Sequence, residues 1–135
     1  ILVRLAKRWR TKMECPLKSF QIELIMAHVL KKNGREEPIE KRFKDFLLYL
    51  AESELKEVIS FPENRKVPVF SDPVVILDPV CDSNNVASRI TEEERKEIVK
   101  IADESWETAN FASEEGDLDI WQELFGRSFK VEDAA

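Results

Sequence analysis

The chain has 135 residues, 43% of them hydrophobic, which suffices for one compact domain with its own hydrophobic core. No apolar run approaches the roughly 20 residues that a membrane-spanning helix needs, and no signal-peptide pattern is present. The two cysteines, Cys15 and Cys81, are too few for a disulfide framework, and neither belongs to a Cys-x-x-Cys pair. We therefore expect a reduced, cytoplasmic protein with no membrane partner.

The net charge of −6 is distributed unevenly along the chain. Residues 1–44 carry 12 basic and 5 acidic side chains, whereas residues 45–135 carry 9 basic and 22 acidic ones. A basic segment on an acidic protein favours a local anion-binding site over general nucleic-acid binding, which requires a broadly basic face. The alternative is two solvated regions of opposite charge without a specific ligand.

The first two predicted helices lie in the basic part of the chain. Over residues 1–13 the apolar residues recur at helical spacing, and Arg4 and Lys7 are neighbours on the opposite, polar face. A second helix is predicted over residues 18–32 and ends at Asn33-Gly34. Its apolar residues point in nearly every direction, which predicts a central, buried helix.

Glu23 is an acidic residue among these apolar positions. Burying an unpaired carboxylate would cost roughly several kcal/mol of folding free energy, because the charged group loses its hydration. We therefore expect Glu23 to form a structural ion pair with a basic residue of the first helix. Arg4 is the first choice as its partner and Arg8 is the second.

Three more helices and one extended segment complete the predicted fold. Pro38 opens the third helix in the favoured first-turn position. Residues 59–77 contain three prolines among short β-branched runs, which predicts a small β-hairpin or an extended loop. Thr91-x-x-Glu94 is a capping box that starts the fourth helix, and the fifth covers residues 117–125. The sequence thus predicts a single, mainly α domain of about five helices over residues 1–135.

Residues that could support catalysis or metal binding are few. His28 has no cysteine or carboxylate partner at metal-ligand spacing, so a packed histidine is expected. Asp117 and Asp119 form a spaced carboxylate pair, but their place at a helix start favours capping over metal binding. With three glycines in all, the sequence contains no phosphate-cradling loop. We predict no catalytic residue and no metal ligand in this chain.

Three segments carry a resemblance to a known family. Residues 2–9, Leu-Val-Arg-Leu-Ala-Lys-Arg-Trp, resemble the first helix of the C-terminal domain of 2′-5′-oligoadenylate synthases. Residues 19–24, Ser-Phe-Gln-Ile-Glu-Leu, are similar to the second nucleotide-contacting helix of that family and of cyclic GMP-AMP synthase. Residues 76–80 with 84–87 are similar to the family's Leu-Asp-Pro-x-Asp-Pro-x-x-Asn-Val element. The resemblance covers about residues 1–126 and is strongest to the bacterial CD-NTases, which make cyclic oligonucleotide signals in CBASS-type antiphage defence.

The resemblance implies one lobe of a two-lobed nucleotidyltransferase. In that family an N-terminal lobe carries a Gly-Ser motif and three metal-binding acidic residues, and a helical C-terminal lobe closes the active-site cleft. The Gly-Ser dipeptide does not occur in this sequence. We therefore expect this chain to be the helical, substrate-binding lobe, with the catalytic lobe and its Mg²⁺ or Mn²⁺ ions upstream of Ile1. The implied ligands are nucleoside triphosphates.

The resemblance also assigns roles to individual residues. Lys7 matches the lysine that reaches the triphosphate, Ser19 the residue that bonds a phosphate oxygen, and Phe20 the aromatic ring that stacks on a base. Arg4 and Asn84 are further nucleotide-binding candidates. Each has a purely structural alternative: Lys7 as a solvated surface lysine, Ser19 as a helix cap, Phe20 as a core residue and Asn84 as part of a turn.

Two departures from the family pattern are visible. The second proline of the Asp-Pro-x-Asp-Pro element is missing, because Ser83 follows Asp82. The cysteine–histidine zinc insertion of the vertebrate cyclic GMP-AMP synthase is absent, so its mode of double-stranded DNA sensing is not expected. Two other functions remain open from the sequence. One is a helical protein-interaction module that docks a partner through its acidic half, and the other is the C-terminal domain of a poly(A)-polymerase-like RNA nucleotidyltransferase.

Overall fold

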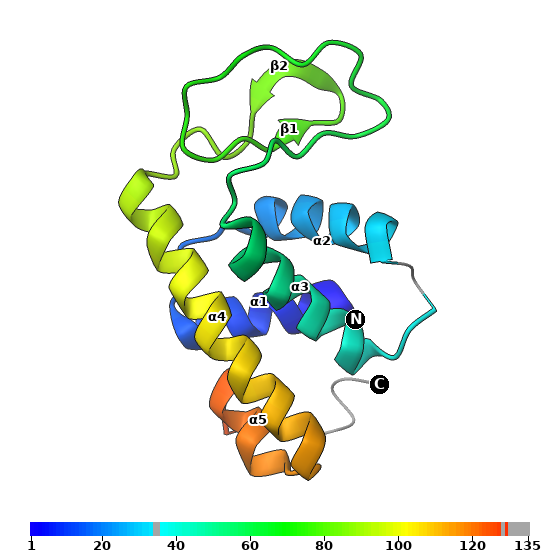
Figure 1. The fold of residues 1–135 in the computed structure, drawn as a ribbon, viewed down its shortest axis with the longest axis vertical. Helices are drawn as coiled ribbons and strands as arrows, with labels where there is room; N and C mark the ends of the chain where they lie inside the picture. The colour runs from blue at the N-terminus through cyan, green and yellow to red at the C-terminus, as the bar shows by residue number, and fades with distance from the viewer. Residues whose placement is uncertain (34–35, 128, 130–135) are drawn as a thin grey trace.

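The structure is a computed structural model that describes residues 1–33, 36–127 and 129. Its elements, in chain order, are α1 (Leu2–Met13), α2 (Ser19–Asn33), α3 (Ile39–Ser53), β1 (Leu77–Asp78), β2 (Cys81–Asn85), α4 (Glu92–Glu115) and α5 (Leu118–Phe125). The five helices confirm the mainly α prediction. Figure 1 shows the helices packed as one body, with the two strands and the loop before them at one end.

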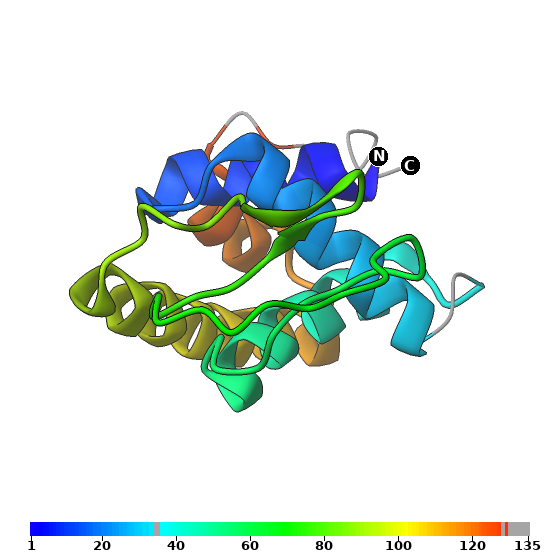
Figure 2. The same cartoon turned by 90° about the horizontal axis from the view of Figure 1, so that it is seen from above.

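The core is organised around Trp9 of α1, whose side chain is fully buried. Its ring lies edge-on to those of Phe43 and Phe46 of α3, at centroid distances of 6.4 and 5.9 Å. Its indole Nε1 donates a hydrogen bond of 3.0 Å to the Ser105 hydroxyl of α4. Helices α3 and α4 also pack along each other, as the view from above shows (Figure 2). Trp9 therefore joins three helices that are distant in sequence.

Helix α2 buries one side and exposes the other, contrary to the prediction of a helix buried all round. Ile22, Ile25 and Val29 form the buried stripe at helical spacing, whereas Phe20 and Glu23, three residues apart, share the open side. The prediction of a buried ion pair at Glu23 is wrong for this reason. The side chain is 47% exposed and pairs with Lys7, not with Arg4 or Arg8.

The segment from 59 to 77 is mostly an extended loop, and the β-hairpin falls at its end and just beyond it. Strands β1 and β2 pair antiparallel, and one parallel bridge links Ile59 to Ile76. The buried Asn85 side chain organises this region. Its Oδ1 accepts hydrogen bonds from the N–H groups of Ile76 and Ala87, and its Nδ2 donates to the Val74 carbonyl. The Asn85 side chain thus forms hydrogen bonds to backbone groups that strand pairing would otherwise satisfy.

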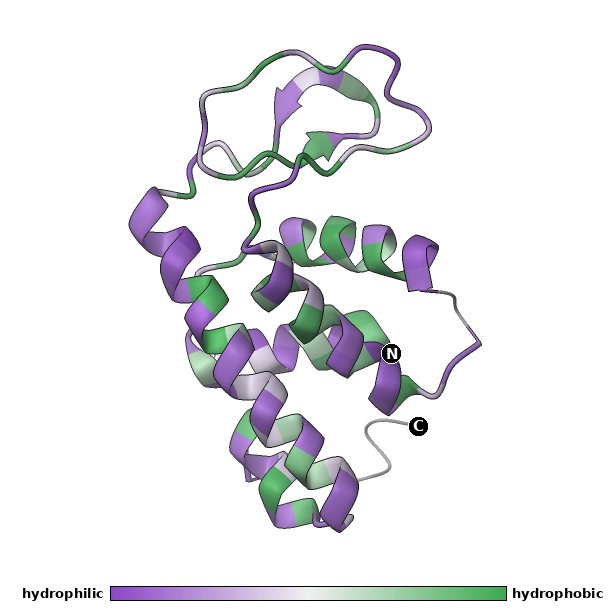
Figure 3. Cartoon of the chain, in the orientation of Figure 1, coloured by the Kyte–Doolittle hydropathy of each residue, from purple (hydrophilic) through white to green (hydrophobic). Residues whose placement is uncertain are grey.

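The predicted helix starts in the acidic half are confirmed. Thr91 and Glu94 form a reciprocal capping box at the start of α4, and the Asp117 carboxylate caps α5 by accepting from the Asp119 N–H. Gly116, in a left-handed conformation at φ 64°, lets the chain turn between the two helices. Figure 3 shows hydrophilic residues along α4, interrupted by the hydrophobic positions that face its neighbours.

Candidate nucleotide-binding site

Helices α1 and α2 are joined on their solvent side by two basic residues of α1. Lys7 Nζ lies 3.2 Å from Glu23 Oε1, and the Lys7 side chain is 31% exposed. Arg10, one turn further along α1, donates from Nη2 to the Ser19 hydroxyl at 3.3 Å and from Nη1 to the Leu17 carbonyl at 2.9 Å. The structure therefore brings Lys7 and Ser19, both predicted site residues, onto one α1–α2 face.

The first turn of α2 presents donors on this face. The first intrahelical bond runs from the Ile22 N–H to the Lys18 carbonyl, so the N–H groups of Ser19 and Phe20 have no intrahelical acceptor. The first turn contains no acidic residue. Free N–H groups and the helix dipole together favour an anion at such a helix start. Ser19 is the first helical residue, and its hydroxyl oxygen accepts a bond from Arg10.

Phe20 is exposed at the start of α2, with 47% of its surface accessible. The core role considered for it from the sequence does not apply. Exposing a large aromatic ring costs hydrophobic free energy, since fully burying a phenylalanine side chain is worth roughly 1.5–3 kcal/mol. An exposed ring next to a helix N-terminus can instead stack on the flat face of a base.

The other two candidates, Arg4 and Asn84, make no hydrogen bond to this group within the described residues. Arg4 is exposed on α1, and Glu23 pairs with Lys7 in its place. Asn84 donates to the Asp78 carboxylate at 3.3 Å, within the hairpin, in agreement with its turn alternative. Arg8 points toward the C-terminal side: its Nε donates to the Phe125 carbonyl at 2.8 Å, and its guanidinium lies 5.3 Å from the ring centre of Phe129.

Two residues of the site were missed from the sequence. Arg10 is three residues from Lys7, so helical spacing alone could have placed it on the same face. Gln21 is buried within α2, where its Oε1 accepts from the Lys18 N–H at 2.8 Å and its Nε2 donates to the Val86 carbonyl at 3.0 Å. No motif signals this role, because it depends on a residue 65 positions away. Gln21 anchors the start of α2 to the end of the hairpin.

The described residues do not fit a metal ion. Within residues 1–33, 36–127 and 129, no group of three or more His, Cys, Asp or Glu side chains could hold one. His28 is half-buried, as predicted: its ring lies edge-on to Tyr49 at 5.3 Å, and its Nε2 is 3.2 Å from Glu57 Oε1. In the same part of the chain, none of the helices is both long enough and apolar enough to cross a membrane.

Comparisons with known proteins identify relatives of this chain, although no family model matches it. It is 79% identical to the CBASS oligonucleotide cyclase CdnC of Escherichia coli strain KTE188, over 99% of this chain and 43% of that relative. It is 35% identical to the cyclic AMP-AMP-AMP synthase of E. coli strain MS 115-1, over 96% of this chain and 44% of that protein. The chain therefore spans less than half the length of the curated relatives it matches.

Solved structures agree with the sequence comparison. The structure of E. coli MS115-1 CdnC with ATP superposes with a TM-score of 0.88 at 34% identity, covering 96% of this chain and 44% of that one. The complex of the same CdnC with HORMA-deltaN gives a TM-score of 0.87 and covers 45% of the solved chain. The chain is therefore the C-terminal part of a CD-NTase, and its fold matches the C-terminal region of CdnC.

Proposed function

We propose that this chain is the nucleotide-binding lobe of a cytoplasmic nucleotidyltransferase that makes cyclic or linear oligonucleotide messengers in antiphage defence. The observation that carries the proposal is the solvent-facing side of α1 and α2, where Lys7 pairs with Glu23, and Ser19 and the exposed Phe20 lie at the start of α2. The family supports it, because the relatives are named as an oligonucleotide cyclase and a cyclic AMP-AMP-AMP synthase. The solved CdnC with ATP points to ATP as a substrate.

The three residues would divide the recognition of a triphosphate among them. Lys7 supplies a point charge for a phosphate oxygen, and Ser19 adds a hydroxyl beside the free N–H groups of the α2 start. Phe20 would stack on the base, a contact worth roughly 1–3 kcal/mol and tolerant of base identity. The lobe would therefore hold and orient the donor nucleotide.

Glu23 would keep Lys7 in place before the nucleotide binds. The ion pair spans α1 and α2 and limits the conformations of the flexible lysine side chain. Both groups are partly exposed, so their attraction is weakened by water and salt. A triphosphate, with several negative charges, can then displace the single carboxylate as the partner of Lys7.

Bond formation is assigned to a second lobe outside this chain, the partner that this lobe would close upon. Mg²⁺ or Mn²⁺ would be held by carboxylates of that lobe, since the described residues here offer no site for it. Ions bound there would supply Lewis-acid chemistry for the transfer of a nucleotide to a ribose hydroxyl. This chain would contribute by positioning the substrate, which lowers the entropic part of the activation free energy.

The test is the Lys7→Ala substitution in the intact cyclase. Loss of a charge-assisted contact worth about 1.5–3 kcal/mol should weaken ATP binding by about 10- to 100-fold. We expect this loss in the KM for ATP, with a smaller change in kcat, measured by product formation at limiting nucleotide. Lys12→Ala is the matched control, because Lys12 is an exposed lysine of the same helix. Equal kinetics for the two variants would contradict the role of Lys7.

A further inference from the structure

A cavity lies on the other side of α1 from α2. It has a volume of about 440 Å³, within the range of roughly 300–1,000 Å³ typical of ligand pockets. Residues of α1, α3, α4 and α5 line it, together with Phe129, and none comes from α2. It is therefore distinct from the candidate nucleotide site.

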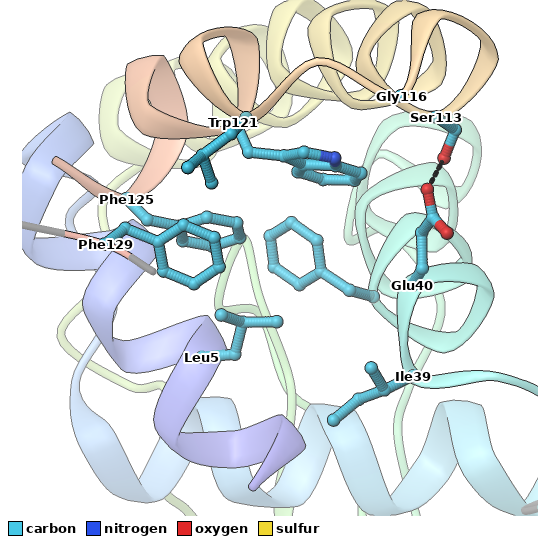
Figure 4. A pocket seen from close by; sticks show the side chains of 10 residues that line it. Leu5, Ile39, Glu40, Ser113, Gly116, Trp121, Phe125 and Phe129 are labelled. Carbon is cyan, nitrogen blue, oxygen red and sulfur yellow. Dashed lines mark hydrogen bonds between the residues drawn. The ribbon is translucent and has the colours of Figure 1, made fainter. Parts of the chain in front are cut away.

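The walls of this cavity are mainly apolar, and four of the ten lining residues are aromatic. Phe125 is central: its ring centre lies 5.1 Å from that of Phe43, 6.1 Å from that of Trp121 and 4.8 Å from that of Phe129. Figure 4 shows Trp121 above the cavity, Phe125 and Phe129 beside it, and Leu5 below Phe129. Such a lining favours a bulky apolar or aromatic group over a phosphate or a sugar.

The rim of the cavity formed by α3, α4 and α5 is acidic, whereas Arg8 lies against the lining residue Phe129. Glu40 accepts a hydrogen bond from the Ser113 hydroxyl at the edge, joining α3 to the end of α4 (Figure 4). Exposed carboxylates directly adjoin the lining residues Ser113, Gly116 and Leu118 in sequence, namely Glu114, Glu115, Asp117 and Asp119. Residues 101–126 contain eight acidic and no basic side chains. Lys41, the nearest cation in sequence to Glu40, is paired with Asp45 at 3.0 Å.

We propose that this acidic aromatic cavity is a docking site for a basic segment of a partner protein that carries one bulky apolar anchor. The aromatic lining would take the anchor, and the rim carboxylates would face flanking lysine or arginine side chains. Charge complementarity favours this occupant. A neutral apolar peptide would gain no electrostatic attraction from the carboxylates, and an acidic peptide would be repelled by them. A concave centre with aromatic residues and a charged rim is typical of interfaces that bind a peptide.

The first experiment measures peptide binding to the intact protein that contains this chain. The probe is a fluorescent peptide with one tryptophan between two runs of three lysines. The comparison peptides replace the tryptophan with serine or the lysines with glutamates. We expect the tryptophan–lysine peptide to bind at least tenfold more tightly than either, and its affinity to fall when salt rises from 50 to 300 mM. Equal binding of the serine peptide, or no binding of the probe, would overturn the proposal.

Two matched pairs of variants locate the binding. Leu118 lines the cavity and is 37% exposed, whereas Phe111 is an exposed residue of α4 outside the lining, so Leu118→Ser and Phe111→Ser remove similar apolar groups from different places. Glu115→Lys reverses a charge at the rim, and Glu63→Lys reverses one on the distant loop. We expect several-fold weaker binding only for Leu118→Ser and Glu115→Lys. Equal losses within each pair would show that the peptide binds elsewhere and overturn the proposal.

Discussion

At the scale of single residues, the Lys7–Glu23 pair changes the role that each side chain can play. The contact with Glu23 restricts the conformations of the Lys7 side chain but does not fix one of them, because both groups remain partly exposed to solvent. Exposed ion pairs of this kind contribute little to folding, with measured values of about 0–1 kcal/mol. The pair is thus better suited to orienting Lys7 than to stabilising the domain.

The first prediction follows from the exposure of Glu23. Glu23→Gln should change the free energy of unfolding by less than about 1 kcal/mol, because no buried charge is left without a partner. Urea unfolding of the wild type and the variant, followed by circular dichroism, measures this difference. A loss above about 3 kcal/mol would be typical of a broken buried ion pair and would contradict the exposed geometry.

At the scale of elements, Glu57 connects three segments of the chain. Its Oε1 accepts a 2.5 Å hydrogen bond from the Tyr49 hydroxyl of α3 and lies 3.2 Å from His28 Nε2 of α2. Glu57 itself is in the loop that connects α3 to the hairpin. The hydrogen bond from Tyr49, and secondarily the one from His28, lowers the pKa of Glu57 below its usual 4.5. The ionised carboxylate is therefore the form that the folded state prefers.

The second prediction is a pH dependence with a defined sign. Because the folded-state pKa of Glu57 is lowered, its contribution to stability is fully present above about pH 4.5 and is lost as the pH falls through the lowered pKa. Glu57→Gln should remove that contribution, so the variant should lose less stability than the wild type between pH 6 and pH 3. The side chain is 44% exposed, so the difference will be small and reduced by salt.

Urea unfolding at several pH values measures this dependence. Glu63→Gln is the matched control, because Glu63 is an exposed glutamate of the loop after Glu57. We expect the control to follow the wild-type pH profile. A Glu57→Gln profile parallel to both would show that Glu57 does not hold these segments together.

The elements also show what the sequence could predict. The capping box at Thr91 and the cap at Asp117 are local signals, so both helix starts were correctly predicted. The open side of α2 was not, because apolar residues all around a helix hide which of them face solvent. The positions of Phe20 and Glu23 depend on where α1 packs, which local spacing does not encode. The bonds of Asn85 likewise depend on chain segments that only the folded structure brings together.

The same limit applies to the candidate site. Lys7, Ser19 and Phe20 were selected through the family resemblance, and composition alone would have left Lys7 as a surface charge. The contacts of Arg10 with Ser19 and of Glu23 with Lys7 join two helices whose relative placement no motif specifies. The aromatic cavity could not be predicted at all, since its lining comes from four helices and from Phe129.

At the scale of the whole molecule, α1 ties the early and late parts of the chain together. Arg8 bonds the carbonyl of Phe125 at the end of α5, and the next residue, Trp9, bonds Ser105 in α4. The two contacts span 117 and 96 positions in the sequence. Since Trp9 also packs on Phe43 and Phe46, α1 cannot separate without opening the core of α3 and α4. We therefore expect the helices to unfold as one cooperative unit.

The third prediction tests this coupling through the buried Trp9–Ser105 hydrogen bond. Trp9→Phe leaves the Ser105 hydroxyl without its partner, and Ser105→Ala does the same to the indole N–H. Each loss should cost about 1–3 kcal/mol for the unsatisfied group, and Trp9→Phe should cost more because it also removes packing. The double variant removes both polar groups, so its loss of stability should be smaller than the sum of the two single losses.

A double-mutant cycle by urea unfolding measures the coupling energy directly. We expect a value of about 1 kcal/mol or more, because the two side chains are in direct contact and fully desolvated. Single, coincident transitions by tryptophan fluorescence and circular dichroism should accompany it in every variant. Additive losses would mean that the hydrogen bond contributes nothing, and two separate transitions would mean that α1 unfolds independently of α4. The second outcome would mean that the stability of α1 is independent of the core, whereas a single transition would tie the α1–α2 face to the core on which it packs.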